Sequence, residues 1–215
     1  MEATKTTAQD IIATYMDYVL EHEHEPKSIY KFCKHQNIQE PEFYAHFGSF
    51  DTLKQQVWQQ FFTHTIQLLE KSKDYEASPA KEKMLSFYYT FFELLTANRS
   101  YVLFTLEDKK NIMKSLQELK GLRQHIKEFA KDLIEHNNEN KSLKITKHPV
   151  SVFSEGAWVQ TLFILKYWME DSSPEFEKTD VVIEKSVRVV FDVFDTTPLE
   201  SLIDFGKFLW KEKMA

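Results

Sequence analysis

The chain has 215 residues, 42% of them apolar, and a formal net charge of −6. This allows one large domain, or a small domain joined to a larger one, and gives no overall attraction to nucleic acid. With only four glycines and six prolines, the composition favours long helices and argues against a strand-rich fold with many turns.

The first predicted element is a helix over residues 7–21, where apolar side chains recur at helical spacing. Two short helices follow, separated by a turn, and a fourth helix starts at about residue 49 and continues past residue 71. Ordinary helix start and stop chemistry marks the boundaries, since Ser caps helices, Pro fits a first turn and Asn tolerates left-handed backbone. These markers are Pro26, Ser28, Asn37, Pro41, Gly48 and Ser49.

The remainder of the chain also has helical periodicity. A boundary is predicted at residues 73–79 and a polar loop at 136–141. Helices are predicted between and beyond them, at 79–97, from about 101 to 136 with a kink near Gly121, and then at 151–170, 173–195 and 198–213. The expected fold class is therefore all-α.

Two motifs in the N-terminal part narrow this further: Tyr44-x-His46-Phe47, and Ser49 followed four residues later by Leu53. With the turn at Asn37, residues 8–62 resemble the N-terminal helix-turn-helix domain of the TetR family of one-component repressors. The resemblance implies a TetR-like fold, with a helix-turn-helix DNA-binding domain over residues 1–50. A helical effector-binding and dimerisation domain would follow over residues 51–215, entered through a connecting helix at 49–72.

The resemblance also implies which residues contact double-stranded operator DNA. Tyr44 and His46 fall where the family contacts phosphates, and Gln39, Glu40, Glu42 and Phe43 fall where it reads base edges. Lys54 completes this set of candidate DNA contacts.

Electrostatics oppose this assignment. Residues 1–65 contain five lysines, no arginine and nine acidic residues, and phosphate neutralisation supplies most non-specific DNA affinity. Phe50 stands where the family commonly has a phosphate-contacting lysine, and Gln39 is a weaker helix cap than the family's serine. An alternative interpretation is that Phe43, Tyr44 and Phe47 are core residues of a fold retained without DNA binding.

For the C-terminal part, the resemblance implies a homodimer through helices near 151–170 and 174–195, and a small apolar effector. Apolar and aromatic residues at helical spacing, with one histidine as a polar anchor, are the candidate lining of an effector pocket. They are Tyr88, Phe91, Phe92, Leu95, His125, Trp158, Leu162 and Leu165.

The tail around residues 158–190 also resembles the TetR-fold ubiquinone-biosynthesis accessory proteins. The alternative function is thus a lipid- or isoprenoid-binding accessory protein without DNA-binding activity. In it, the aromatic and lysine-bearing helix 198–213 would make a peripheral membrane contact.

The sequence offers no sign of enzymatic or cofactor chemistry. The single cysteine, Cys33, excludes an intrachain disulfide and fits a reducing compartment, and no signal peptide or membrane-spanning run is visible, so we expect a cytoplasmic protein. Nucleotide-binding and hydrolase motifs are lacking, and residues 22–25 (His-Glu-His-Glu) lack the fixed spacing of a helical metal site. We therefore expect no enzyme, no cofactor and no metal.

Overall fold

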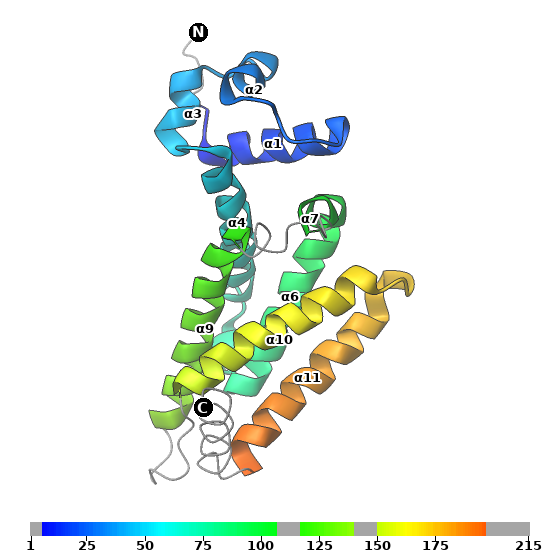
Figure 1. The fold of residues 1–215 in the computed structure, drawn as a ribbon. Coiled ribbons are helices and arrows are strands. Elements are labelled where there is room, and N and C mark those ends of the chain that lie inside the picture. The colour runs from blue at the N-terminus through cyan, green and yellow to red at the C-terminus, as the bar shows by residue number, and fades with distance from the viewer. Residues whose placement is uncertain (1–5, 107–116, 140–149, 197–215) are drawn as a thin grey trace, which may run out of the picture. The chain divides into compact units, whose positions relative to one another are not determined.

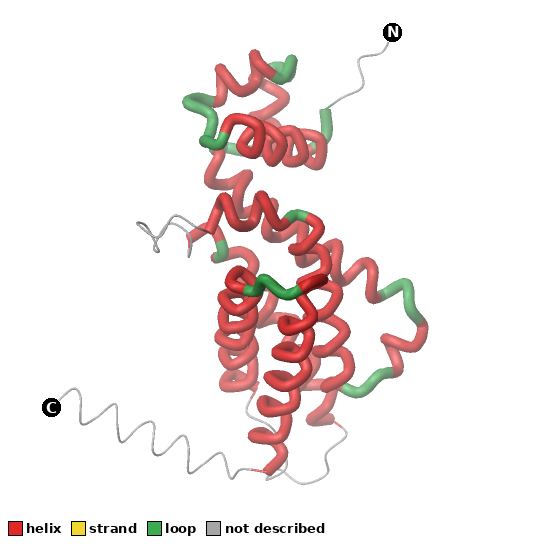
Figure 2. The backbone as a smooth tube through the Cα atoms, turned by 90° about the vertical axis from the view of Figure 1, so that its right-hand side faces the viewer, coloured by secondary structure: helices red, strands yellow, loops and turns green. Residues whose placement is uncertain are grey.

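The structure is a computed structural model that describes residues 6–106, 117–139 and 150–196, and every regular element in these ranges is a helix (Figure 2). The all-α fold class is therefore confirmed. None of the helices in these ranges is long and apolar enough to cross a membrane.

Four helices make up the N-terminal part: α1 (Ala8–His22), α2 (Ile29–His35), α3 (Glu40–His46) and α4 (Phe50–Leu69). Side-chain caps start three of them. Thr7 accepts from the backbone N–H of Asp10, and Ser28 and Ser49 cap α2 and α4 in the same way, as the sequence predicts. Figure 1 shows α1, α2 and α3 gathered at the start of α4. We call the group α1–α3 the head.

The middle of the chain differs from the prediction in two places. A short helix, α5 (Lys73–Ala77), forms where a boundary was predicted, ahead of α6 (Ala80–Ala97) and α7 (Arg99–Leu106). Next comes α9 (Lys120–Glu139), which continues into the predicted polar loop. Ile134 and Asn138 are both buried and lie four residues apart, so the buried side of the helix extends into that region.

The last described helices, α10 (Val150–Glu170) and α11 (Glu177–Thr196), pack against each other. The rings of Phe153 and Phe191 are 5.4 Å apart, and Gln160 donates a 3.0 Å hydrogen bond to Ser186. The predicted start of α11 at Ser173 is wrong. A 3₁₀ turn, η2 (Pro174–Phe176), precedes the helix, and left-handed backbone at Glu175 and Phe176 interrupts the helical path.

Contacts divide the chain into two compact units. One consists of Met1–Glu76 and Phe87–Ile126, and the other of Ala77–Ser86 and Lys127–Ala215. The first holds the head, α4 and α7, and the second holds α10 and α11. The functional division at residue 50 remains a prediction.

Candidate nucleic-acid interface

The head is held together by aromatic side chains. Phe32 of α2 and Phe43 of α3 are both 0% exposed, with ring centroids 6.2 Å apart. Phe50 lies 5.6 Å from Phe43 and 5.7 Å from Phe32, in edge-to-face contacts that stabilise such cores. The residue that replaces the family's lysine therefore packs on the core of the head.

The turn between α2 and α3 has the backbone that its sequence predicts. Asn37 has a φ of 55°, in the left-handed region, and the N–H of Ile38 donates to the carbonyl of Cys33 at 2.9 Å. Ile38 is buried, so it anchors the turn. This geometry presents α2 and α3 as a helix-turn-helix pair.

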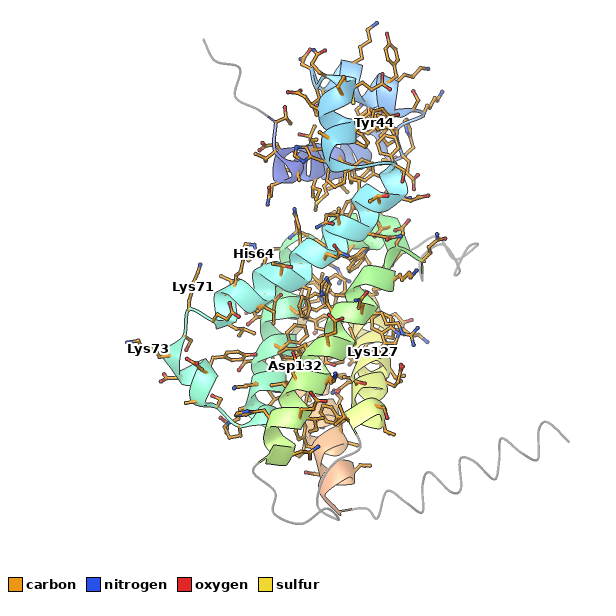
Figure 3. All side chains as sticks on the ribbon, turned by 90° about the vertical axis from the view of Figure 1, so that its left-hand side faces the viewer. Tyr44, His64, Lys71, Lys73, Lys127 and Asp132 are labelled. Carbon is orange, nitrogen blue, oxygen red and sulfur yellow. The ribbon has the colours of Figure 1, made fainter. Side chains whose placement is uncertain are left out.

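The exposed face of α3 is uncharged except near its start. Tyr44 is 52% exposed and belongs to the head in Figure 3, and Gln39 is exposed too. Glu40 is half-buried. These three side chains are predicted base and phosphate contacts that the structure leaves accessible without a hydrogen bond to the described segment before α1.

Two other predicted contacts are held by the segment before α1. The Glu42 carboxylate accepts from the backbone N–H of Gln39 at 3.1 Å and from the Thr6 hydroxyl at 3.4 Å. A carboxylate at this position also stabilises the N-terminus of α3. The Nε2 atom of the exposed His46 is 3.0 Å from the Thr6 carbonyl oxygen, to which it donates when that nitrogen is protonated.

Two predicted DNA contacts need correction. Phe43 is fully buried and serves the core, as the alternative interpretation of the sequence expected. Lys54 is 2% exposed, and its ammonium lies 3.1 Å from carboxylate oxygens of Glu25, Asp51 and Glu118. It is unavailable to a phosphate.

The structure indicates a different set of cations, which the sequence analysis missed. Lys27, Lys31 and Lys34 are all exposed on or just before α2, and none has an ion pair within the described part of the chain. Lys31 and Lys34 are three residues apart on α2 and therefore lie on one side of the helix, and Lys27 lies just before its N-cap Ser28. Tyr30, 58% exposed, lies beside them, with its ring centroid 6.0 Å from the Nζ atom of Lys34. The positions of these lysines can be read from the sequence, but a net charge summed over residues 1–65 does not reveal them.

The candidate pocket residues are mostly buried. On α6, Tyr88, Phe91, Phe92 and Leu95 are at most 3% exposed. His125 of α9 is half-buried and stacks on Phe62 at 5.1 Å. The candidates on α10 are two buried residues, Trp158 and Leu165, and the half-buried Leu162. Their role in a pocket remains a prediction.

The predicted dimer helices carry exposed apolar side chains. On α10, Val159 is 64% exposed and Phe163 54%, and on α11 Val189 is 59% exposed. Gly156 precedes Val159 by one turn, and a Cβ atom built there meets nothing within 4 Å. The whole set, which we call the α10–α11 face, is Val152, Gly156, Val159, Phe163, Val181, Val189 and Val193.

Comparison with known proteins identifies the family. Residues 83–209, more than half of the chain, match the family model described as the tetracycline repressor-like C-terminal domain.

The chain belongs to the TetR family.

A solved structure of a TetR-family transcriptional regulator from Streptomyces coelicolor is 14% identical, covers 91% of this chain and 92% of its own, and has a TM-score of 0.40. A likeness at this level supports no argument about the TetR-family protein described here. No curated protein matches the chain.

Metal binding and membrane contact were also considered for this TetR-family protein. Across the described ranges, no group of three or more His, Cys, Asp or Glu side chains could hold a metal ion. The helix predicted at 198–213, on which the membrane-contact alternative depended, lies outside the described residues.

Proposed function

We propose that this TetR-family protein is a one-component transcriptional regulator that binds double-stranded operator DNA as a dimer and responds to a small apolar effector. The observation that carries the proposal is the set of three exposed lysines on or just before α2, the helix that packs against α3. Cations on α2 and reading residues on α3 would divide two tasks, since phosphate contacts position a protein on DNA and base contacts give sequence preference.

Three acidic residues of the N-terminal region are engaged by groups of the protein itself. Glu25 and Asp51 are both within 3.1 Å of Lys54, and Glu42 is bonded to the start of α3. Each of these carboxylates has a partner inside the protein. Lys27, Lys31 and Lys34 remain available for phosphates.

The reading residues that we propose are Gln39, Glu40 and Tyr44. Glutamine suits adenine, and glutamate accepts a hydrogen bond from the cytosine amino group. The Tyr44 hydroxyl suits a phosphate oxygen. In a dimer, two such heads would enter successive major grooves about 34–36 Å apart.

The dimer is supported by the α10–α11 face, since exposed apolar groups gathered on two neighbouring helices mark an interaction surface. An apolar effector suits the aromatic composition of the candidate lining residues on α6. Effector binding would regulate by favouring one of two arrangements of the heads.

Salt-dependent binding tests this function. The affinity for the promoter region beside the protein's own gene should fall linearly with salt concentration on logarithmic axes, with a slope that counts phosphate contacts. Lys31→Gln should weaken binding to all sequences and reduce the magnitude of that slope by about one. Fluorescence anisotropy at several salt concentrations measures both.

Lys71→Gln is the matched control, because Lys71 is also exposed but lies beyond the end of α4 that is distant from the head (Figure 3). It should leave affinity and slope unchanged. Absence of a salt-sensitive, sequence-dependent interaction at micromolar protein concentration would rule out the proposed function.

A further inference from the structure

The Lys54 ammonium joins three parts of the chain. Each of its three N–H donors has a carboxylate oxygen at 3.1 Å, from Glu25, Asp51 and Glu118. Asp51 is one turn earlier on α4, Glu25 is in the loop between α1 and α2, and Glu118 is in the residues just before α9. We call these four residues the Lys54 cluster.

Lys54 keeps its positive charge although it is buried. Burial alone would lower the pKa of Lys54, but the charges of Glu118 and Glu25 and hydrogen bonds with Asp51 and Glu118 raise it above its ordinary value. Burial, with smaller contributions from the charges of Glu25 and Glu118, also raises the pKa values of the Tyr15 and Tyr101 hydroxyls, which stay neutral. Lys54 therefore stays protonated in its buried position.

Its contacts are concentrated where the head is attached. Glu25 precedes the buried Pro26 and is three residues before Ser28, which caps α2. Fixing Glu25 against α4 therefore fixes the start of the helix that carries the exposed lysines. Glu118 is 6% exposed and fixes α4 against the start of α9.

We propose that Lys54 is a positioning residue, which sets the orientation of α2 and α3 relative to α9 through its contacts with Glu25 and Glu118. Its importance for DNA binding rests on the proposed function. The proposal gives the three carboxylates unequal roles, because Asp51 belongs to the same helix as Lys54 and its contact cannot connect separate elements.

Three matched substitutions test whether the carboxylates have unequal roles: Glu25→Gln, Glu118→Gln and Asp51→Asn. Each converts one carboxylate to an amide of nearly the same size, and the amide oxygen still accepts a hydrogen bond, although more weakly than a charged group. Each leaves the ammonium with two carboxylates. Removal of Lys54 itself would instead leave three carboxylates around a buried space, and such a variant is at risk of not folding.

The direct measurement is a distance between spin labels at Ala45→Cys on α3 and Lys120→Cys on α9, by double electron–electron resonance. Both labelling positions are exposed. The native Cys33 is 2% exposed and should not react with the label, and repeating the measurement in a Cys33→Ala background checks this. Labelled protein is diluted with excess unlabelled protein to suppress distances between protomers. Glu25→Gln and Glu118→Gln should shift or broaden the distance distribution, most of all when combined, whereas Asp51→Asn should reproduce the unsubstituted distribution.

Equal shifts in all three variants would overturn the proposal, since they would reflect only the loss of one negative charge. The absence of a shift in every variant would also overturn it. A DNA measurement adds a second readout: Glu118→Gln should weaken operator binding about tenfold while Asp51→Asn stays near the unsubstituted affinity. If the unsubstituted protein binds no DNA, the proposed function fails, while the distance measurements still decide the role of Lys54.

Discussion

Asp171 accepts four hydrogen bonds in the connection between α10 and α11. They come from the backbone N–H and hydroxyl of Ser173 and from the same two groups of Thr179, at 2.7–2.9 Å. Burial alone would raise the pKa of this carboxyl, but the hydrogen bonds outweigh burial and hold the pKa at about 2, below its ordinary value of 3.8. One side chain thus fixes both the turn and the start of α11.

Asp171→Asn should lower the free energy of unfolding at neutral pH by about 2 kcal/mol, because the amide nitrogen cannot accept the hydrogen bonds made to one carboxylate oxygen. The folded-state pKa is depressed, so this stabilisation is complete above the unfolded-state value near 3.8 and is lost as pH falls toward 2. The difference between the two proteins should therefore shrink below pH 4, as measured by urea unfolding. Asp132→Asn, at an exposed carboxylate of α9, is the control, and a pH-independent difference would contradict the account.

At the scale of elements, the α2–α3 turn depends on the backbone of Asn37. A φ of 55° places the Cβ atom close to a carbonyl oxygen, a conformation that Gly and Asn tolerate better than other residues. Both the turn and the residue responsible were predictable because this requirement is local. Gly48 shows the reverse, since it ends the predicted helix without a positive φ, and open space surrounds its position.

Asn37→Ala should reduce stability by about 1 kcal/mol, and Asn37→Gly should be close to neutral. The comparison at one position isolates the left-handed conformation, since both substitutions remove the same amide side chain. Urea unfolding of the three proteins measures it. Equal losses in the two variants would mean that the amide group, and not the backbone, is what the turn requires.

Two helix boundaries differ from those that the sequence predicted. Periodicity located the helices of the described ranges, but α9 continues past residue 136 to Glu139, with Asn138 buried. Asp171 accepts hydrogen bonds from Ser173 and Thr179 where α11 was predicted to start. The residue types at these two boundaries did not by themselves indicate where α9 ends or where α11 begins. Propensity is a weak guide at such boundaries because tertiary packing overrides it.

At the scale of the whole molecule, the α10–α11 face should be the surface at which two copies meet. Val159→Asp would place a charge at the centre of the apolar row, and burying an unpaired charge is costly. The substituted protein should therefore sediment as a monomer in analytical ultracentrifugation while keeping its helical circular dichroism. Leu20→Asp, at an exposed aliphatic residue of α1, should leave the sedimentation unchanged.

Gly156→Leu provides a second measurement at the same face. The position is open within one chain, so a larger side chain should be tolerated by the fold and obstruct only a partner helix. A dimer that survives both substitutions would exclude the α10–α11 face as its interface.

The amino-acid sequence by itself determined the all-α class, the caps of the first helices, the Asn37 turn and the family resemblance. These depend on residues near one another along the chain, where backbone preferences and helical spacing act directly. Only the tertiary structure decided which charges are available, because an ion pair forms between residues that folding brings together. It put Lys54 among Glu25, Asp51 and Glu118, buried Phe43, and left the lysines of α2 exposed. A net charge summed along the sequence could not make that distinction, since it gives buried, paired and exposed charges the same weight.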